Sequence, residues 1–437
     1  MSFRPNSRTP LDCVIGLLGM ALLAATGLGV EPVPPPPSRL SPLAPAPDWG
    51  TLNRFQNTIR RGEFESLLHE VFAPGDAAAP YVTISDAAAR IVTGQPGDDF
   101  ILRFADGRDD RPAPRGWKRA ADQPATSRDR PLAGVRIALD PGHIGGDWAR
   151  MEERWFQIGD APPVMEGEMT LRTARHLAAR LKSLGAEVSF VRDRNAPVAG
   201  DGPERFTSVG ARLLADQGFA EPRARYDGPN DPARQQTVQW QSELLFYRTS
   251  EIRQRARIVN QRLRPDLTLC LHFNAEPWGD PSAPELVELN HLHLLVNGNY
   301  RAGELRFEDI RYDMIRRLVG RTGTEELALA ESVAAALAAA TGLPPYVYKG
   351  DNARAVGSTG YVWSRNLLAN RLFDGPVLYL EPYVMNSRAV FARLQAGDYE
   401  GRRDFDGVSR ESIYREYANA VADGLARHYR SHRRISP

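Results

Sequence analysis

Three polar side chains in this sequence stand where α/β proteins commonly place their chemistry. His143, His272 and Glu381 each follow, directly or after a short turn, an apolar run that is typical of a buried strand. In an open α/β sheet, ligands bind outside the carboxyl ends of the strands, so side chains far apart in sequence can meet there. Two imidazoles and a carboxylate suit a catalytic zinc ion that keeps one position open for water. The pattern therefore predicts a metal site at this edge of a sheet.

A further ligand is expected at the start of an amphipathic helix. Residues 165–168 read Met-Glu-Gly-Glu and precede Leu171, Ala174 and Leu177, which recur at helical spacing. A carboxylate there is held in place by a helix that packs on the sheet. Periodicity alone leaves Glu166 and Glu168 as equal candidates.

The elements that must position these side chains alternate between strands and helices across residues 132–430. We predict strands at 135–139, 187–192, 267–273, 292–296 and 377–381, and helices starting near residues 171, 252, 324 and 413. Such alternation is typical of the α/β class with helices on both faces of a sheet. We therefore predict a three-layer α/β/α catalytic domain with a mostly parallel or mixed sheet.

The first 47 residues carry an export signature. Arg4 and Arg8 precede an apolar stretch from Leu11 to Val30, which is typical of a signal peptide. The stretch is also long enough to span a bilayer, so residues 1–30 are either a cleaved signal or an N-terminal membrane anchor. Both alternatives place the protein in the periplasm or cell envelope. Residues 31–47 are rich in proline and are expected to form an extended linker.

A small α+β domain is predicted at residues 48–106. Apolar residues recur at helical spacing over 52–72, and two strand-like stretches follow at 81–84 and 100–104. Wall binding, partner docking and simple packing all fit this domain. A polar linker at 107–131 is expected to separate it from the catalytic domain.

Net charge and cysteine content limit what this protein can be. The formal net charge is +1, so no general attraction to nucleic acid is implied. The chain has two cysteines, Cys13 in the apolar N-terminal stretch and Cys270 in a predicted strand, so no disulfide framework is expected.

The segments that carry these side chains resemble the N-acetylmuramoyl-L-alanine amidases of the Amidase_3 type. The matching segments occur in the order of that family and span roughly residues 132–430. They are Leu139-Asp140-Pro141-Gly142-His143, Glu166 five residues before Leu171, Arg255 with Asn260, Leu271-His272-Phe273-Asn274-Ala275, and Pro376-Val377-Leu378-Tyr379-Leu380-Glu381 with Asn386 beyond.

The resemblance implies a role for each site residue. It implies one zinc ion held by His143, Glu166 and His272, with Glu381 as the catalytic carboxylate, and the offset to Leu171 favours Glu166 over Glu168. The implied activity is hydrolysis of the amide between N-acetylmuramic acid and the L-alanine of the stem peptide, in peptidoglycan. Two alternatives are a zinc hydrolase of another amide or peptide and a non-catalytic cell-wall-binding protein.

Three further features are an insertion, a pair of histidines and an arginine. An insertion at 194–247 is rich in glycine, proline and charge, and its placement suggests that it shields the substrate groove and makes the enzyme depend on an activator protein. His291 and His293 alternate along one strand and are interpreted as polar positions on a half-exposed face. Arg365 either contacts substrate or forms a surface salt bridge.

Overall fold

The computed structural model describes residues 39–94, 97–228, 230–278 and 284–436. The predicted signal peptide or anchor at 1–30 lies outside these residues, as do residues 31–38 of the proline-rich linker. Within the described ranges, no helix is long and apolar enough to cross a membrane.

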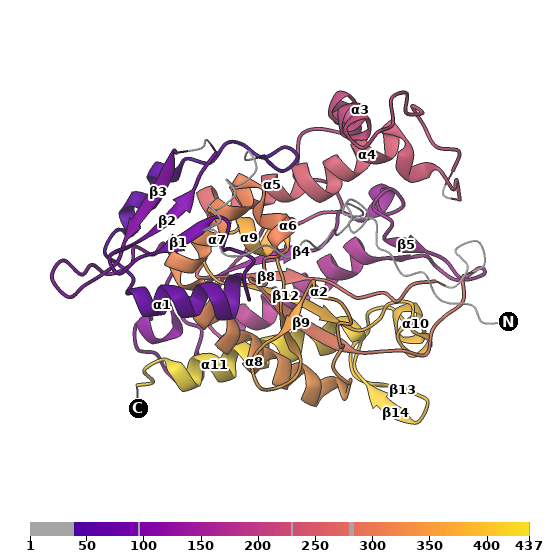
Figure 1. Ribbon diagram of the computed structural model, residues 1–437. Coiled ribbons are helices and arrows are strands. Elements are labelled where there is room, and N and C mark those ends of the chain that lie inside the picture. The colour runs from indigo at the N-terminus through magenta and orange to yellow at the C-terminus, as the bar shows by residue number, and fades with distance from the viewer. Residues whose placement is uncertain (1–38, 95–96, 229, 279–283, 437) are drawn as a thin grey trace, which may run out of the picture. The chain divides into compact units, whose positions relative to one another are not determined.

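A seven-stranded mixed sheet forms the centre of the fold, with strand order β10-β11-β9-β12-β8-β4-β7 (Figure 1). The strands are β4 (Arg136–Pro141), β7 (Glu187–Phe190), β8 (Leu267–Leu271), β9 (Leu292–Val296), β10 (Arg354–Ala355), β11 (Val362–Ser364) and β12 (Val377–Pro382). Strands β7, β4, β8 and β12 run parallel, whereas β9 runs antiparallel to β12. Strand β11 is parallel to β9, and β10 is antiparallel to β11. The predicted α/β class with a mostly parallel or mixed sheet is confirmed.

One face of the sheet is covered by three long helices, α2 (Glu166–Ser183), α8 (Thr322–Thr341) and α11 (Ile413–His432). Successive residues of a strand point to opposite faces, so Leu267, Leu269 and Leu271 of β8 all point to this face. They join the largest apolar core of the molecule. The packing of α2 on this core fixes the start of that helix next to the ends of the strands.

The opposite face packs on shorter helices. Ala138, Cys270 and Val377 of the strands share an apolar cluster with α5 (Glu251–Arg257) and α9 (Leu368–Leu372). Helix α7 (Glu308–Gly320) packs in turn on α9. Helices therefore flank both faces of the sheet, which gives the predicted three layers, and Cys270 is a buried free thiol.

The small N-terminal region contains an antiparallel sheet of β1 (Val82–Ile84), β2 (Ala88–Val92) and β3 (Asp99–Arg103), with α1 (Arg61–Ser66) beside it. The sequence analysis missed β2 because its Ala-Ala-Arg start has little strand propensity. This region shares its core with α7 through Met314 and Leu318. The domain boundary at 107–131 stays a prediction.

The remaining α-helices and strands connect this framework. They are α3 (Thr207–Asp216), α4 (Val238–Leu244), α6 (Ala302–Leu305), α10 (Arg388–Gln395), β5 (Trp155–Phe156), β6 (Val164–Met165), β13 (Arg403–Phe405) and β14 (Val408–Arg410).

Candidate metal centre

Three of the predicted site residues meet at the carboxyl ends of the parallel strands. His143 lies in the turn after β4, Glu166 is the first residue of α2, and His272 directly follows β8. Ligand atoms of the three residues lie within 4.8 Å of one another. His143 Nε2 is 3.2 Å from Glu166 Oε2, and His272 Nδ1 is 3.1 Å from Glu166 Oε1. Glu168, the other carboxylate left open by periodicity, is not part of this group.

Glycines allow these three segments to approach so closely. A Cβ added at Gly142 would lie 2.2 Å from the ring of His272, so any other residue there would displace the imidazole. A Cβ at Gly167 would lie 2.3 Å from the backbone nitrogen of Gly145, where the β4 loop touches the start of α2. Gly145 itself has a φ of +78°, a conformation that glycine adopts without steric cost.

Two buried arginines hold the carbonyl groups of the loop that carries His143. Arg255 of α5 donates from Nη2 to the carbonyl of His143 at 2.8 Å and from Nη1 to Asp140 Oδ1 at 2.8 Å. Arg192 donates to the carbonyls of Gly142 and Gly167, at 3.3 and 2.8 Å. Because a guanidinium has five donors in a fixed fork, each arginine fixes several carbonyls at once.

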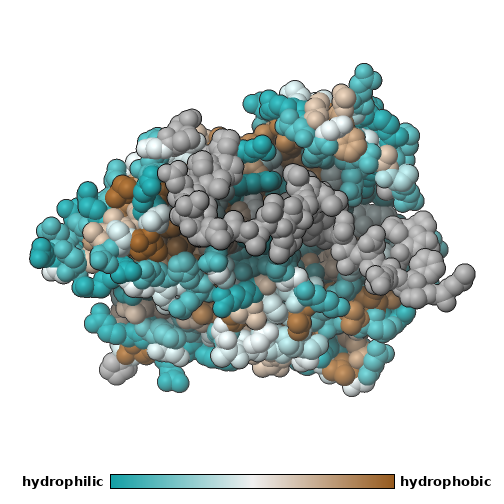
Figure 2. Space-filling model, viewed as in Figure 1, coloured by the Kyte–Doolittle hydropathy of each residue, from teal (hydrophilic) through white to brown (hydrophobic). Residues whose placement is uncertain are grey.

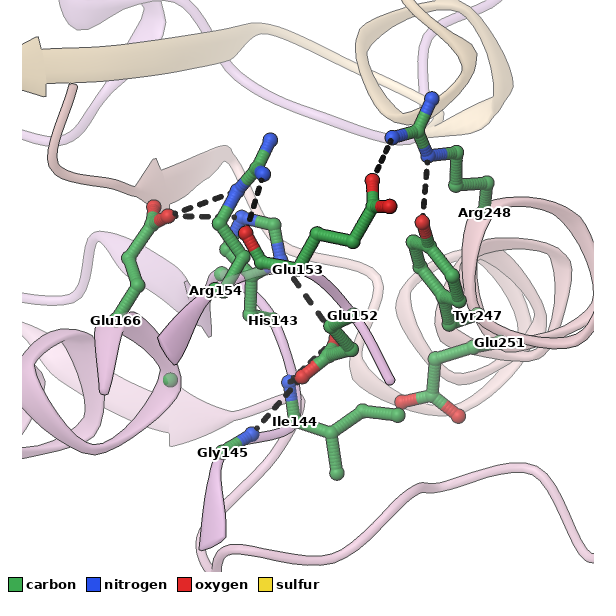
Figure 3. A network of polar contacts seen from close by, with 12 residues as sticks. His143, Ile144, Gly145, Glu152, Glu153, Arg154, Glu166, Tyr247, Arg248 and Glu251 are labelled. Carbon is green, nitrogen blue, oxygen red and sulfur yellow. Dashed lines mark hydrogen bonds and ion pairs between the residues drawn. The ribbon is translucent and has the colours of Figure 1, made fainter. Parts of the chain in front are cut away.

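Glu152 orients His143 from the other side. Its carboxylate accepts hydrogen bonds from the backbone N–H groups of Ile144 and Gly145, and Oε1 lies 3.6 Å from His143 Nδ1 (Figure 3). Ligand histidines in metal sites typically place their second nitrogen against such an acceptor. His143 has a φ of +58°, a sparsely populated conformation for a residue other than glycine, and such strain concentrates at functional sites.

The next residues of this loop connect the centre to the insertion. Arg154 Nε lies 3.2 Å from Glu166 Oε2, and Glu153 Oε1 lies 3.1 Å from Arg234 of the insertion (Figure 3 shows the contact of Arg154 with Glu166). Glu153 also faces Arg248, at 3.9 Å. The insertion therefore contacts the loop whose Arg154 reaches the candidate ligand Glu166.

The insertion has an apolar inner side and a hydrophilic outer side. Phe206, Leu245 and Phe246 pack on Ile144, the residue after His143. In the view of Figure 2, the outer surface of α3 and α4 is mostly hydrophilic. The apolar contact anchors the insertion beside the metal centre, and its role in activation stays a prediction.

The donor set and its spacing fit a divalent metal ion such as zinc. His143 lies 3.2 Å from one oxygen of Glu166 and His272 lies 3.1 Å from the other, and one ligand atom from each residue falls within 4.8 Å of the rest. Histidine nitrogens and a carboxylate oxygen are usual zinc ligands. Glu166 Oε2 is buried and has no hydrogen bond of acceptable geometry, although His143 and Arg154 lie 3.2 Å away. The three side chains could therefore hold one metal ion.

Electrostatics favour the ligand forms of two of these groups. Burial lowers the pKa of His272 to about 4, so its imidazole is neutral at neutral pH. Burial alone would raise the pKa of Glu166, but the two neighbouring imidazoles outweigh it and hold that pKa well below its usual range. A neutral imidazole and an ionised carboxylate are the forms that bind a cation.

Glu381 lies beside this centre at the end of β12. Its neighbour Leu380 pairs with Leu271 of β8, the residue before His272, so Glu381 and His272 end adjacent parallel strands. Burial, together with the charge of Glu166, raises the pKa of Glu381 to about 8. Among the described residues, no hydrogen-bond or ion-pair partner of its carboxylate is present. All four predicted residues are thus brought to one place.

Some residues of the centre carry no signal in the sequence. Arg192 and Glu152 belong to no recognisable motif, and only their burial beside polar backbone identifies them. The interpretation of His291 and His293 as half-exposed is wrong, because their side chains are buried, with relative exposures of 7% and 3%. Strand β9 lies inside the sheet between β11 and β12, and Tyr346 covers both imidazoles.

Comparisons with known proteins find likenesses among solved structures. No protein-family model matches the sequence. No curated protein matches it either. Similar solved structures include the N-acetylmuramyl-L-alanine amidase Ami1 of Mycobacterium abscessus, with 18% identity, a TM-score of 0.35, and coverage of 68% of this chain and 99% of that chain.

Two other similar solved structures are also named as amidases. The amidase AmiC2 of Nostoc punctiforme has 16% identity and a TM-score of 0.33, over 69% of this chain and 98% of that chain. The CwlD amidase of Clostridioides difficile, solved in complex with the GerS lipoprotein, has 13% identity and a TM-score of 0.36, over 68% and 98%. Identities and TM-scores this low carry no conclusion about function.

Proposed function

We propose that this chain is a zinc-dependent amidase that hydrolyses the amide between N-acetylmuramic acid and the L-alanine of the stem peptide in peptidoglycan. The observation that carries the proposal is the convergence of His143, Glu166 and His272 on one point, within 4.8 Å, with a fourth acidic residue at the end of the next strand. The sequence segments around these residues resemble the Amidase_3 type and supply the substrate class.

A bound zinc ion would supply Lewis acidity at this point, lowering the pKa of water from about 15.7 towards 7 and polarising the amide carbonyl. The chain's own residues position the ligands and transfer the proton. Glu152, Arg192 and Arg255 hold the loop of His143 in the geometry that ligation requires. Their contacts leave little room for the donors to rearrange during a reaction cycle.

Glu381 is the proposed general base and acid. Its carboxylate takes a proton from the attacking water and then gives that proton to the leaving amine of L-alanine, so the proton is conserved over the cycle. Burial and the charge of Glu166 raise the pKa of this carboxyl to about 8 in the metal-free protein, and a bound cation would lower that pKa towards neutral pH, where a carboxylate can both accept and release a proton. The absence of a competing partner among the described residues leaves this carboxylate available to the substrate.

The substrate and the N-terminal sequence together favour an exported protein. Peptidoglycan lies outside the cytoplasmic membrane, and the signal-like stretch before residue 31 would direct the chain there. Cell-wall degradation in the periplasm or cell envelope is the resulting cellular role.

The proposal is tested by digesting purified peptidoglycan with the full chain and assaying for a new free amine on L-alanine. Glu381→Gln is expected to keep stoichiometric zinc and to lower hydrolysis by about 10²–10⁴-fold, because general acid–base help is removed while the metal ligands remain. Arg180→Gln serves as a matched control, since Arg180 forms an exposed ion pair with Asp423 away from the centre.

Each alternative has its own signature in this assay. A new amine on a residue other than L-alanine would identify a different zinc hydrolase. A protein without zinc, on which Glu381→Gln has no effect, would be a non-catalytic wall-binding protein. Deletion of residues 194–247 would remove the predicted activator dependence if the insertion controls access to the groove.

A further inference from the structure

Strand β9 places a buried histidine directly beside the candidate base. Because β9 runs antiparallel to β12, its start lies next to the end of β12, and His293 pairs with Glu381 across the two strands. Residues directly opposite in an antiparallel pair point to the same face, with Cβ atoms about 4.5–5.5 Å apart. The side chain of His293 therefore lies on the face of the sheet that carries the Glu381 carboxylate.

His293 belongs to a chain of three polar side chains. Its Nε2 lies 3.0 Å from the hydroxyl of Tyr348, and that hydroxyl lies 3.4 Å from Nη1 of Arg365. A guanidinium only donates hydrogen bonds, so the hydroxyl accepts from Arg365 and is left able to donate its own proton to His293 Nε2. In that arrangement the neutral imidazole of His293 carries its proton on Nδ1.

That proton has no partner in the protein. Nδ1 of His293 is buried and lacks a hydrogen bond within the described part of the chain. A buried donor without a partner is destabilising, and a bound acceptor would offset that cost. Burial, helped by the charges of His291 and Arg365, lowers the pKa of His293 to about 3, so the imidazole stays a neutral donor.

Arg365 adds a positive charge that no carboxylate neutralises. Within the described residues its guanidinium has no ion-pair partner, and its contacts are the hydroxyl and the ring face of Tyr348. By contrast, Arg154 and Arg234, near the same centre, each face a carboxylate at 3.1–3.2 Å. The charge of Arg365 nevertheless acts on the centre, since it lowers the pKa of Glu381.

An aromatic wall extends this group away from Glu381. The rings of Tyr346 and Tyr348 meet edge to face at 4.8 Å, and Tyr346 lies 4.6 Å from the ring of His291. His291 is fixed in turn by Glu276, at 2.8 Å. Stiff, half-buried rings such as these hold a neighbouring guanidinium in one orientation at little cost in entropy.

We propose that Arg365 and the Nδ1–H of His293 form a carboxylate-binding subsite of the candidate active site, which recognises an acidic group of the stem peptide next to the scissile amide. This inference rests on the proposed function and adds its substrate preference. A carboxylate there would pair with the free guanidinium and accept from the unpartnered imidazole, while Tyr348 keeps both donors in place. Arg365 is thus a specificity-determining residue, and Tyr348 is a positioning residue.

The test compares two soluble ligands that differ only in charge. They are N-acetylmuramoyl-L-alanyl-D-glutamate and the same compound with both carboxylates converted to carboxamides. Binding is measured with the full-length, zinc-loaded Glu381→Gln variant, so that neither ligand is consumed, and KM is measured with the otherwise unaltered chain.

The expected result is a preference of about tenfold or more for the carboxylate ligand, because charge-assisted hydrogen bonds are the stronger kind. Adding Arg365→Gln should abolish that preference and leave the affinity for the carboxamide unchanged. Arg365→Lys in place of Arg365→Gln should restore part of the preference, since lysine keeps the positive charge but lacks the paired N–H donors of a guanidinium. Arg180→Gln should change neither affinity.

Two results would overturn the subsite. One is equal affinity of the parent protein for both ligands, and the other is an equal loss for both ligands on Arg365→Gln, which would mean that Arg365 only supports Tyr348. Failure of the unaltered chain to hydrolyse either ligand would count against the proposed function instead, because the binding comparison does not depend on hydrolysis.

Discussion

Two pairs of histidines flank Glu381, and they are built in opposite ways. His143 and His272 come from different strand ends, and their rings meet edge to face at 5.1 Å with Glu166 between them. His293 lies in β9 and His291 directly precedes that strand, and the centroids of their rings lie 6.4 Å apart. The first pair shares the carboxylate of Glu166, whereas in the second pair His291 contacts Glu276 and His293 contacts Tyr348.

The difference shows what spacing along a chain can and cannot do. Residues two apart on a strand share a face, but parallel side chains do not converge on one point. Convergence requires separate elements whose ends meet, which the parallel strands and the start of α2 provide. Within the described residues, only the first pair belongs to a group of three potential metal ligands.

The largest expected effect separates the two pairs by metal content. His143→Ala should abolish stoichiometric zinc binding, because two ligands from one side of the ion do not hold it tightly, whereas His293→Ala should keep the metal. Metal analysis of the purified, folded variants measures both. Tight zinc binding by His143→Ala, or loss of zinc binding in His293→Ala, would contradict the assignment of the metal site to the first pair.

A smaller effect is expected from filling the space behind His272. Gly142→Ala would place a Cβ 2.2 Å from the imidazole, so the ring must move. Overpacking of this kind costs about 1–3 kcal/mol of stability and should weaken zinc binding as well. Thermal unfolding and zinc titration measure the two effects.

The matched control is Gly62→Ala, where an added Cβ meets nothing within 4 Å. This change should leave zinc binding intact and stabilise the protein slightly, since alanine is the better helix former. Similar behaviour of the two variants would show that the close approach at Gly142 does not position the ligand.

The smallest expected effect is a pH dependence confined to the first pair. Burial alone would lower the pKa of His143, but Glu166 and Glu152 outweigh it and raise that pKa above its usual value of about 6.5. At pH values below this raised pKa, the metal-free protein holds a proton on His143 that a metal must displace. Below that pKa, zinc affinity should fall by about tenfold per pH unit.

Competition with a chelator at several pH values between 5 and 8 measures this slope. His293, whose pKa is lowered to about 3, should not titrate in the same range. An affinity that is constant across the range would mean that His143 is not a ligand, or that its proton is lost before the metal arrives.

Much of the metal centre could be predicted from the sequence. His143 and His272 follow apolar runs. A polar residue that follows a buried parallel strand lies at the carboxyl end of the sheet, where ligands bind. The choice between Glu166 and Glu168 needed the family resemblance, because both residues lie in the first turn of α2. The insertion was visible in the sequence, but its apolar contact with Ile144 was not.

The sequence by itself determined which side chains can bind a metal and at which strand ends they stand, because local hydrophobic patterns report strands and their termini. Only the tertiary structure decided that β9 runs antiparallel beside β12, and hence that His293 faces Glu381. Strand order and direction depend on how the whole chain packs, and no local pattern encodes them. The reach of long side chains such as Arg365 and Arg192 depends on the same packing.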